Sequence, residues 1–260
     1  MVADGRADPV TAPPDAWTQL GTPRPGGTLI IADHASNHVP ADIDLGIAPA
    51  LLGLHIALDI GVAGTAARLV DAGAADAAIL GGVSRLVVDC NRDRHAPALV
   101  PIASDGHAIP GNALDHAARE ARIARFFDPY HAHIAATLDA APPAMIVSLH
   151  SFTPSLASDP VDRPWQVGIL YNADDRLARV AIPAFTAAGL VTGDQQPYSG
   201  KLLNATMNRH AEARWIPYLG IEMRQDMVGD AAGEAAMAAT IAHILALCRH
   251  HLAQSGALGQ

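Results

Sequence analysis

The sequence predicts an α/β protein in which a central sheet is covered by helices on both faces. Short apolar runs of strand length recur along the chain, and stretches with helical periodicity separate them. Several of these runs stop abruptly at polar residues. Half of the 260 residues are hydrophobic and only 4% are aromatic, so the core must be built mostly from aliphatic side chains. Strands that alternate with helices are typical of sheets buried on both sides.

The apolar runs define the predicted strands. The first, 29–32, ends at the polar turn 33–37, and Pro40 closes that turn. The later strands are expected at 77–80, 83–90, 144–149, 165–171 and 218–223. In open α/β sheets, ligands bind just beyond the carboxyl ends of the strands. Polar residues that follow the strands are therefore the first candidates for a functional site.

Apolar residues repeat every three to four positions in the segments between the strands. The clearest helix spans about 115–140. The other helices are predicted at 48–55, 59–70, 174–188 (interrupted or restarted near Pro183), 204–214 and 233–252. Residues 95–112, 155–164 and 193–201 have the composition of loops. Residues 1–27 are rich in Pro, Gly, Ala and Asp, so we expect an arm that docks loosely, if at all, before one domain at 28–260.

Charge and composition exclude several classes of function. A formal net charge of -9 argues against a nucleic-acid backbone or an anionic membrane as the main partner, although local arginines could still bind a small-molecule carboxylate. No apolar run reaches about 18 residues, so no membrane span is expected. No basic segment followed by an apolar one marks a secretory signal. Cys90 and Cys248 form no short-spaced pair, which favours a reducing cytosol.

Common catalytic motifs are not found in the sequence. It contains no G-x-S-x-G nucleophile elbow, no G-x-G-x-x-G after a strand, no C-x-x-C and no H-E-x-x-H. Gly200-Lys201 suggests a phosphate loop, but Gln195 and Leu202 stand where that motif needs Gly and Ser or Thr. The candidates that remain are dispersed polar groups.

Four of these groups have the chemistry of a catalytic zinc site. His34 and His150 each follow a strand, Asp59 opens a predicted helix, and Glu222 lies in or at the end of a strand. Two histidines and a carboxylate are a catalytic-zinc ligand set in which water takes the fourth position. A further glutamate can act as general base toward that water. Bidentate pairing with a substrate carboxylate is available from Arg85, Arg92, Arg94 and Arg224.

Each candidate also has a purely structural interpretation. His34 and His150 could be core histidines bonded to the backbone, and Asp59 could stabilise a helix N-terminus. A glutamate in an apolar strand needs a partner or a function, so Glu222 could form a structural ion pair. The remaining candidates with structural alternatives are Arg92 in an ion pair, Asn37 in its own turn, and His210 on the solvent face of a helix.

An ordered set of short motifs resembles the N-formylglutamate amidohydrolase family. The matching segments are Asp33-His34-Ala35-Ser36-Asn37 with Pro40, Asp59-Ile60-Gly61, Val87-Val88-Asp89-Cys90-Asn91-Arg92, Ser148-Leu149-His150-Ser151-Phe152, Gly193-Asp194 with Pro197-Tyr198, His210, and Ile221-Glu222-Met223-Arg224-Gln225-Asp226. They cover about residues 28–226. The family resembles zinc carboxypeptidases and aspartoacylases, which implies a single-domain, three-layer phosphorylase/hydrolase-like α/β fold with a mixed central sheet.

The resemblance implies roles for individual residues. His34 and His150 would hold one zinc ion, Glu222 would activate water, and His210 would be a further catalytic residue. Asn91-Arg92 resembles the pair that grips a substrate carboxylate in the related peptidases. Those peptidases have H-x-x-E for the first two ligands, whereas this chain has Asn37 at the fourth position. Either Asp59 completes the site, or metal binding is weak or absent.

The implied activity is hydrolysis of the C–N amide bond of N-formylglutamate or a similar N-acyl amino acid. The loop 193–198 reads GDQQPY in place of the family's GDN-x-PY, which leaves the substrate open. The alternatives are a carboxypeptidase-like or other N-acyl deacylase, and a non-catalytic anion-binding homologue without metal. Each of these hypotheses that includes a metal requires His34, His150 and Glu222 to lie close together in the structure.

Overall fold

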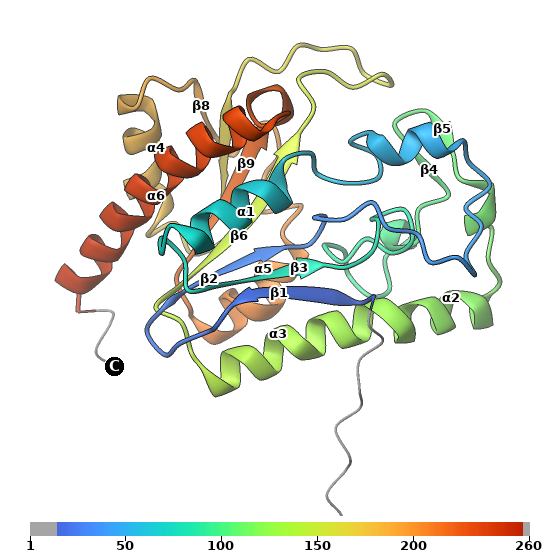
Figure 1. Cartoon of the computed structure of the whole chain (residues 1–260), viewed down its shortest axis with the longest axis horizontal. Coiled ribbons are helices and arrows are strands. Elements are labelled where there is room, and N and C mark those ends of the chain that lie inside the picture. Colours follow the sequence, from blue (N-terminus) through green and yellow to red (C-terminus); the bar gives the residue numbers. More distant parts are fainter. Residues whose placement is uncertain (1–14, 257–260) are drawn as a thin grey trace, which may run out of the picture.

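A mixed seven-stranded sheet forms the centre of the protein in the computed structural model, which describes residues 15–256 (Figure 1). The strand order is β1-β3-β2-β6-β9-β7-β8. The strands are β1 (Trp17–Gly21), β2 (Thr28–Ala32), β3 (Ala77–Gly81), β6 (Met145–Phe152), β7 (Val167–Leu170), β8 (Thr192–Asp194) and β9 (Tyr218–Arg224). A separate two-stranded hairpin joins β4 (Ala103–Ser104) to β5 (His107–Ala108).

The three central strands are parallel neighbours, and this arrangement determines where the site lies. β2 pairs with β6, and β6 with β9, both in parallel register. All five residues of β2 and all eight of β6 are buried, because helices cover both faces of the sheet. Within the seven-stranded sheet as described, the pairs β1–β3 and β7–β9 are antiparallel. The carboxyl ends of β2, β6 and β9 therefore open onto one edge.

Helices cover the two faces of the sheet. They are α1 (Val62–Asp71), α2 (His116–Arg122), α3 (Asp128–Ala140), α4 (Ala178–Ala187), α5 (Ala205–His210) and α6 (Ala231–Gln254). α6 packs against α1 and α4 on one face, while α3 meets α5 on the other through His131 and His210 (Figure 1). This is the three-layer α/β arrangement with a mixed sheet that was expected.

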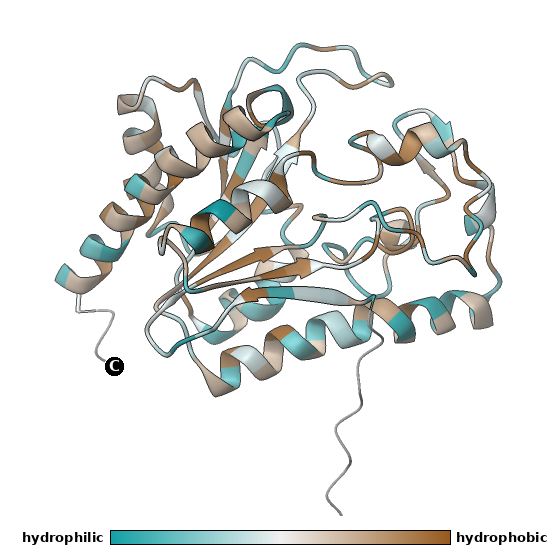
Figure 2. Cartoon of the chain, in the orientation of Figure 1, coloured by the Kyte–Doolittle hydropathy of each residue, from teal (hydrophilic) through white to brown (hydrophobic). Residues whose placement is uncertain are grey.

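The core is apolar along the strands, as the hydropathy colouring shows (Figure 2). The predicted helix 115–140 is observed as α2 and α3 joined by a π-helical turn, Ile123–Phe127. Asp115 caps its start by accepting a bond from the backbone N–H of Ala118 at 2.8 Å. The turn directs Phe126 and Phe127 into the core, where both are fully buried.

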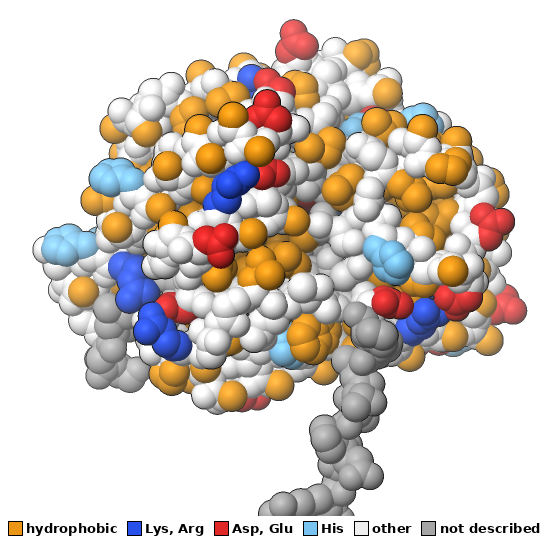
Figure 3. Space-filling view, viewed as in Figure 1, with side chains coloured by type: hydrophobic (Ala, Val, Ile, Leu, Met, Phe, Trp, Pro, Cys, Tyr) orange, Lys and Arg blue, Asp and Glu red, His pale blue; other side chains and the backbone are white. Residues whose placement is uncertain are grey.

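α6 is long and apolar enough to cross a membrane by length and composition alone. Its apolar face is instead part of the core, where Met237, Ile241, Ile244 and Leu252 are at most 4% exposed. On the molecular face drawn in Figure 3, acidic and basic side chains lie interspersed over the surface. α6 therefore has the character of a core helix of an α/β domain.

Two expectations about secondary structure are wrong. The apolar run 83–90 is not a strand, because Ser84 closes tight turns there: its carbonyl accepts from the N–H groups of Val87 and Val88. The second concerns the arm at 1–27. Residues 1–14 lie outside the described residues, but β1 pairs antiparallel with β3 and Ala16 is 1% exposed. The chain therefore joins the sheet before residue 28.

Candidate metal centre

Three side chains converge at the carboxyl edge of the sheet. His34 lies two residues after β2, and His150 lies within β6, which continues past the predicted end. Asp59 lies three residues before α1, outside the helix it was predicted to open. The backbone N–H of Asp59 donates to the carbonyl of His34 at 2.9 Å, which ties the two loops together. The sheet and this bond place all three residues in one buried cluster.

The cluster has the dimensions of a metal site. His34 Nδ1 lies 3.3 Å from Asp59 Oδ2, and His150 Nδ1 lies 2.8 Å from the same oxygen. One ligand atom from each residue falls within 4.8 Å of the other two. Zinc–nitrogen bonds of about 2.0–2.1 Å place two ligands of one ion roughly 3–3.5 Å apart. These three residues could therefore hold one cation through His34, Asp59 and His150.

The far nitrogen of each histidine faces a carboxylate. His34 Nε2 lies 2.8 Å from Asp89 Oδ1, and His150 Nε2 lies 3.4 Å from Asp33 Oδ2. Such outer carboxylates fix the ring orientation of metal-binding histidines and raise their basicity. The arrangement turns both Nδ1 atoms toward Asp59, where a cation would be held.

Asp33 is itself held in place from two helices. Its Oδ1 accepts hydrogen bonds from the hydroxyls of Tyr130, at 3.0 Å, and Thr206, at 2.8 Å. Tyr130 belongs to α3 and Thr206 to α5, so the layer of helices beneath the sheet determines the position of Asp33. The cluster is therefore supported by contacts far apart in the sequence.

Arg85 binds two of the carboxylates. Its Nη1 donates to Asp59 Oδ1 at 3.0 Å, and its Nη2 donates to Asp89 Oδ2 at 3.0 Å. The Asp59 oxygen that faces the histidines is the other one, Oδ2. Arg85 thus orients Asp59 while leaving Oδ2 directed at the cluster, and it also lines the cavity beside the cluster, where it was predicted to bind substrate.

The charged groups packed together in the cluster shift the pKa values of its residues. Burial and Arg85 lower the pKa of His34, but Asp89 and Asp59 outweigh them and raise it above the usual value. Burial also opposes protonation of His150, yet bonds to Asp33 and Asp59 raise its pKa well above the usual range. The pKa of Asp59 is lowered despite burial, chiefly by His34 and His150. Metal binding at such a site must displace protons from histidine.

Glu222 faces the cluster from β9, in register with His150 of β6. Burial, opposed by His150 and reinforced by Asp59, raises the pKa of Glu222 to about 7. Its Oε2 is buried and has no hydrogen-bond partner among residues 15–256. A buried carboxylate without a partner is costly unless it has a function. A pKa near neutrality is suited to taking and giving up a proton.

These observations fit a bound cation. The donor set is two nitrogens and one carboxylate, which zinc prefers. Beside this set stands Glu222, whose buried Oε2 has no hydrogen-bond partner among residues 15–256. Asp59 completes the triad, as the first of the open alternatives proposed.

A cavity of about 130 Å³ opens onto the cluster, which we call the metal-site cavity. His34, Asp59, His150 and Glu222 all line it. Its remaining lining residues are His55, Arg85, Asn91, Arg92, Ser151, Phe152, Thr153, Tyr198 and Leu203. The predicted carboxylate-binding pair Asn91 and Arg92 therefore does lie at the cavity that holds the cluster.

Four predicted residues lie elsewhere. Asn37 is exposed and donates to the carbonyl of Leu52 at 3.0 Å, so it supports a turn and contacts no cluster residue. Arg224 is paired with Asp226 at 2.7 Å and does not line the cavity. The other two are Arg94, held by Glu120 and Asp128, and His210.

His210 is not a catalytic residue of this cavity. α5 directs it toward α3, where its Nε2 lies 2.9 Å from His131 Nδ1. His131 Nε2 in turn donates to the carbonyl of Cys90 at 3.0 Å. His210 is buried, against the solvent-facing alternative, and it supports the loop that carries Asn91.

The sequence did not predict a role for the two carboxylates that support the cluster histidines, Asp33 and Asp89, or for Tyr198, which lines the metal-site cavity. Asp33 and Asp89 lie inside the quoted motifs, directly beside or near His34 and Asn91, but no role was assigned to them. Their position next to motif residues at strand ends was the available signal. Tyr198 lies in the loop after β8, and its hydroxyl accepts from Arg163 Nη1 at 2.9 Å. That contact spans 35 residues, and no local pattern reveals it.

Known structures share the fold of this protein. A gene product from Agrobacterium tumefaciens of known structure is 28% identical, with a TM-score of 0.84 over 93% of this chain and 96% of that chain. The N-formylglutamate amidohydrolase from Ralstonia eutropha is 18% identical, with a TM-score of 0.67 over 93% of this chain and 99% of that chain. At that identity the second likeness shows the fold alone. A search of curated proteins finds no match.

The family comparison identifies the family of this chain. The model of the family described as N-formylglutamate amidohydrolase matches residues 27–229 of the 260, a span that contains every residue of the cluster and the cavity. The chain therefore belongs to the N-formylglutamate amidohydrolase family.

Proposed function

We propose that this protein is a zinc-dependent hydrolase that cleaves the C–N amide bond of N-formylglutamate or a similar N-acyl amino acid. Family membership supports an amidohydrolase, and the cluster of His34, Asp59 and His150 supports a metal. The chemistry that a bound zinc ion supplies is polarisation of a carbonyl and acidification of a water molecule.

The chain's own residues would carry out the remaining steps. Glu222 accepts the proton of the attacking water and later delivers it to the leaving nitrogen. Arg92 and Asn91 hold the carboxylate of the amino-acid part. The Oδ1 of Asn91 already accepts from the backbone N–H of Thr206 at 3.1 Å, so its amide NH₂ is left for the substrate. Water adds across the amide bond, and the products are a carboxylic acid and an amine.

The observation that carries this proposal is the position of Glu222. Its buried Oε2 has no hydrogen-bond partner among residues 15–256. Its pKa of about 7 suits a group that acts as general base and then as general acid near neutral pH. A structural role in an ion pair, the alternative left open by the sequence, would require a partner for Oε2 that the described chain does not provide.

The non-catalytic alternative was motivated by Asn37. Asn37 binds the carbonyl of Leu52, and Asp59 occupies the third ligand position that Asn37 could not fill. We therefore favour the enzyme. Deacylation of longer N-acyl groups is the remaining alternative, and a substrate panel distinguishes it. The cytosol is the proposed compartment, in which the buried thiols of Cys90 and Cys248 stay reduced.

The test is hydrolysis of N-formylglutamate by protein purified without chelator and supplemented with zinc. Release of formate that disappears in Glu222→Gln supports the proposal. If the same preparation hydrolyses N-acetylated amino acids faster than N-formylglutamate, the acyl specificity is wrong. If Glu222→Gln leaves hydrolysis unchanged, the mechanism is wrong.

A further inference from the structure

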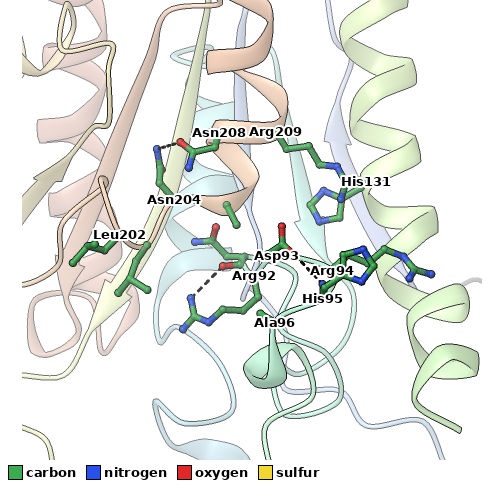
Figure 4. A pocket seen from close by; sticks show the side chains of 13 residues that line it. Arg92, Asp93, Arg94, His95, Ala96, His131, Leu202, Asn204, Asn208 and Arg209 are labelled. Atoms are coloured by element: carbon green, nitrogen blue, oxygen red, sulfur yellow. Dashed lines mark hydrogen bonds between the residues drawn. The ribbon is translucent and has the colours of Figure 1, made fainter. Parts of the chain in front are cut away.

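A second and larger cavity adjoins the metal-site cavity (Figure 4). It measures about 680 Å³, against about 130 Å³ for the metal-site cavity. The two share three lining residues, Asn91, Arg92 and Leu203. We call this space the Arg209 cavity, after the residue that reaches across it from α5 toward His131.

The charge of the Arg209 cavity is set by which of its arginines are already paired. Arg94 is bound by Glu120 Oε2 at 3.0 Å and by Asp128 Oδ2 at 3.2 Å, so its charge is compensated. For Arg209, no carboxylate lies within salt-bridge distance among residues 15–256. Its guanidinium rests on the ring of Phe127, 5.5 Å from the centroid. Asp93 is the one carboxylate that lines the cavity. Arg209 can therefore receive an anion.

Arg92 stands between the two cavities. Its Nη1 donates to the carbonyl of Asn91 at 3.1 Å, and its Nη2 lies 3.6 Å from Asp89 Oδ2. Because Arg92 lines both cavities, a substrate with its α-carboxylate on Arg92 and its amide at the cluster would direct its side chain toward the Arg209 cavity. The acyl group lies on the other side of the scissile bond.

The size of the Arg209 cavity exceeds what a single glutamate side chain fills. That side chain has only two methylene groups and a carboxylate, whereas cavities of about 300–1,000 Å³ hold ligands of drug size. One wall is apolar, formed by Leu202 and Leu203, which are 83% and 38% exposed. The far end carries Arg209. The shape and charge suit an extended chain that ends in an anion.

We propose that the Arg209 cavity is a second substrate subsite, and that it selects N-acyl amino acids whose side chain continues several atoms beyond glutamate and ends in a carboxylate. This inference rests on the proposed function, because it assumes the substrate orientation given by Arg92. N-formyl-γ-glutamylglutamate has the required chemistry: its first α-carboxylate remains available to Arg92, and its second residue supplies carboxylates for Arg209.

The test compares kcat/KM for N-formyl-γ-glutamylglutamate and N-formylglutamate with the zinc-supplemented full chain. We expect the longer substrate to be preferred by about tenfold or more, the effect of one well-placed charge-assisted pair. Arg209→Gln should abolish that preference, and Arg209→Lys should restore part of it. Arg94→Gln is the matched control: the same cavity loses a compensated charge, so the substrate ratio should stay within about twofold of wild type.

A binding measurement separates this inference from the proposed function. Calorimetry with the product γ-glutamylglutamate requires no hydrolysis, and the affinity should fall about tenfold in Arg209→Gln but not in Arg94→Gln. If this holds while neither formylated compound is hydrolysed, the subsite stands and the proposed reaction fails. If both substrates are hydrolysed equally and Arg209→Gln changes neither the ratio nor product affinity, the reaction stands and the subsite is overturned.

Discussion

His150 and Glu222 lie directly opposite each other across the parallel pair β6–β9. The register places a histidine of the metal cluster and an unpartnered carboxylate side by side, 72 positions apart in the chain. Both project toward the cavity because residues in register on neighbouring strands share a face of the sheet. The register places Glu222 beside the cluster, where burial and Asp59 raise its pKa against the opposing effect of His150.

Replacement of Glu222 by Gln should abolish proton transfer without removing metal. We expect kcat to fall by about 10²–10⁴, the usual contribution of a general base, with a much smaller change in KM. The measurement is steady-state hydrolysis of N-formylglutamate together with metal content. Loss of metal in the variant would show instead that Glu222 supports the cluster.

Asp89 should determine metal affinity through His34. Asp89→Asn weakens the orientation of the ring and leaves Arg85 with one carboxylate fewer, so affinity for zinc should fall by about 10–100-fold. Competition with a chromogenic chelator measures this. Asp226→Asn, which removes the partner of Arg224 outside the cavity, is the control. Equal zinc affinity in the two variants would refute the role of Asp89.

Substitution of Asp59 and substitution of Asn37 should have entirely different effects on zinc binding. Asp59→Asn removes the third ligand and should leave the protein without stable zinc. Asn37→Ala removes only a bond from an exposed side chain to the carbonyl of Leu52, so it should cost about 0.5–1.5 kcal/mol of stability at most and retain zinc. Metal analysis of both variants decides between Asp59 and Asn37 as the ligand.

The sequence predicted much of the sheet and the members of the cluster, but not their support. β2, β6 and β9 are long apolar runs, and their polar ends indicated where His34, His150 and Glu222 would meet. The run 83–90 was wrongly predicted to be a strand, because its apolar residues enter the core from turns. Asn37 and Arg224 were predicted to bind substrate but lie outside the cavity. Asn37 is hydrogen-bonded to the carbonyl of Leu52, and Arg224 is paired with Asp226.

Contacts across long sequence separations could not be predicted from local patterns. Asp33 is held by Tyr130 and Thr206, which are 97 and 173 residues away. β1 at Trp17–Gly21 pairs with β3 although the segment around it is rich in turn-forming residues. Such contacts depend on which helix covers which strand, and composition does not encode that choice.

The buried pair His131–His210 should make stability fall in mild acid. Burial lowers the pKa of His131 to about 4 and, together with His131, that of His210 to about 3, from 6.5. The unfolded chain therefore binds more protons than the folded chain below pH 6.5. The contribution of the pair to stability is full above pH 6.5 and is lost as pH falls toward 4, by roughly 3 kcal/mol for each histidine.

Urea unfolding between pH 7 and pH 4 measures this loss. In His210→Gln the remaining histidine should still titrate, so the dependence on pH should be shallower than in the wild type. An unchanged dependence in that variant would mean that other groups, such as the cluster carboxylates, cause the loss.

If His34, Asp59 and His150 hold one catalytic metal ion, elemental analysis of protein purified without chelator detects it directly, followed by assay of hydrolysis before and after addition of zinc. We expect close to one zinc per chain, or activity that appears on zinc addition, and loss of both in Asp59→Asn. Protein that binds no zinc and shows no hydrolysis after zinc is added would show that these three residues hold no catalytic metal.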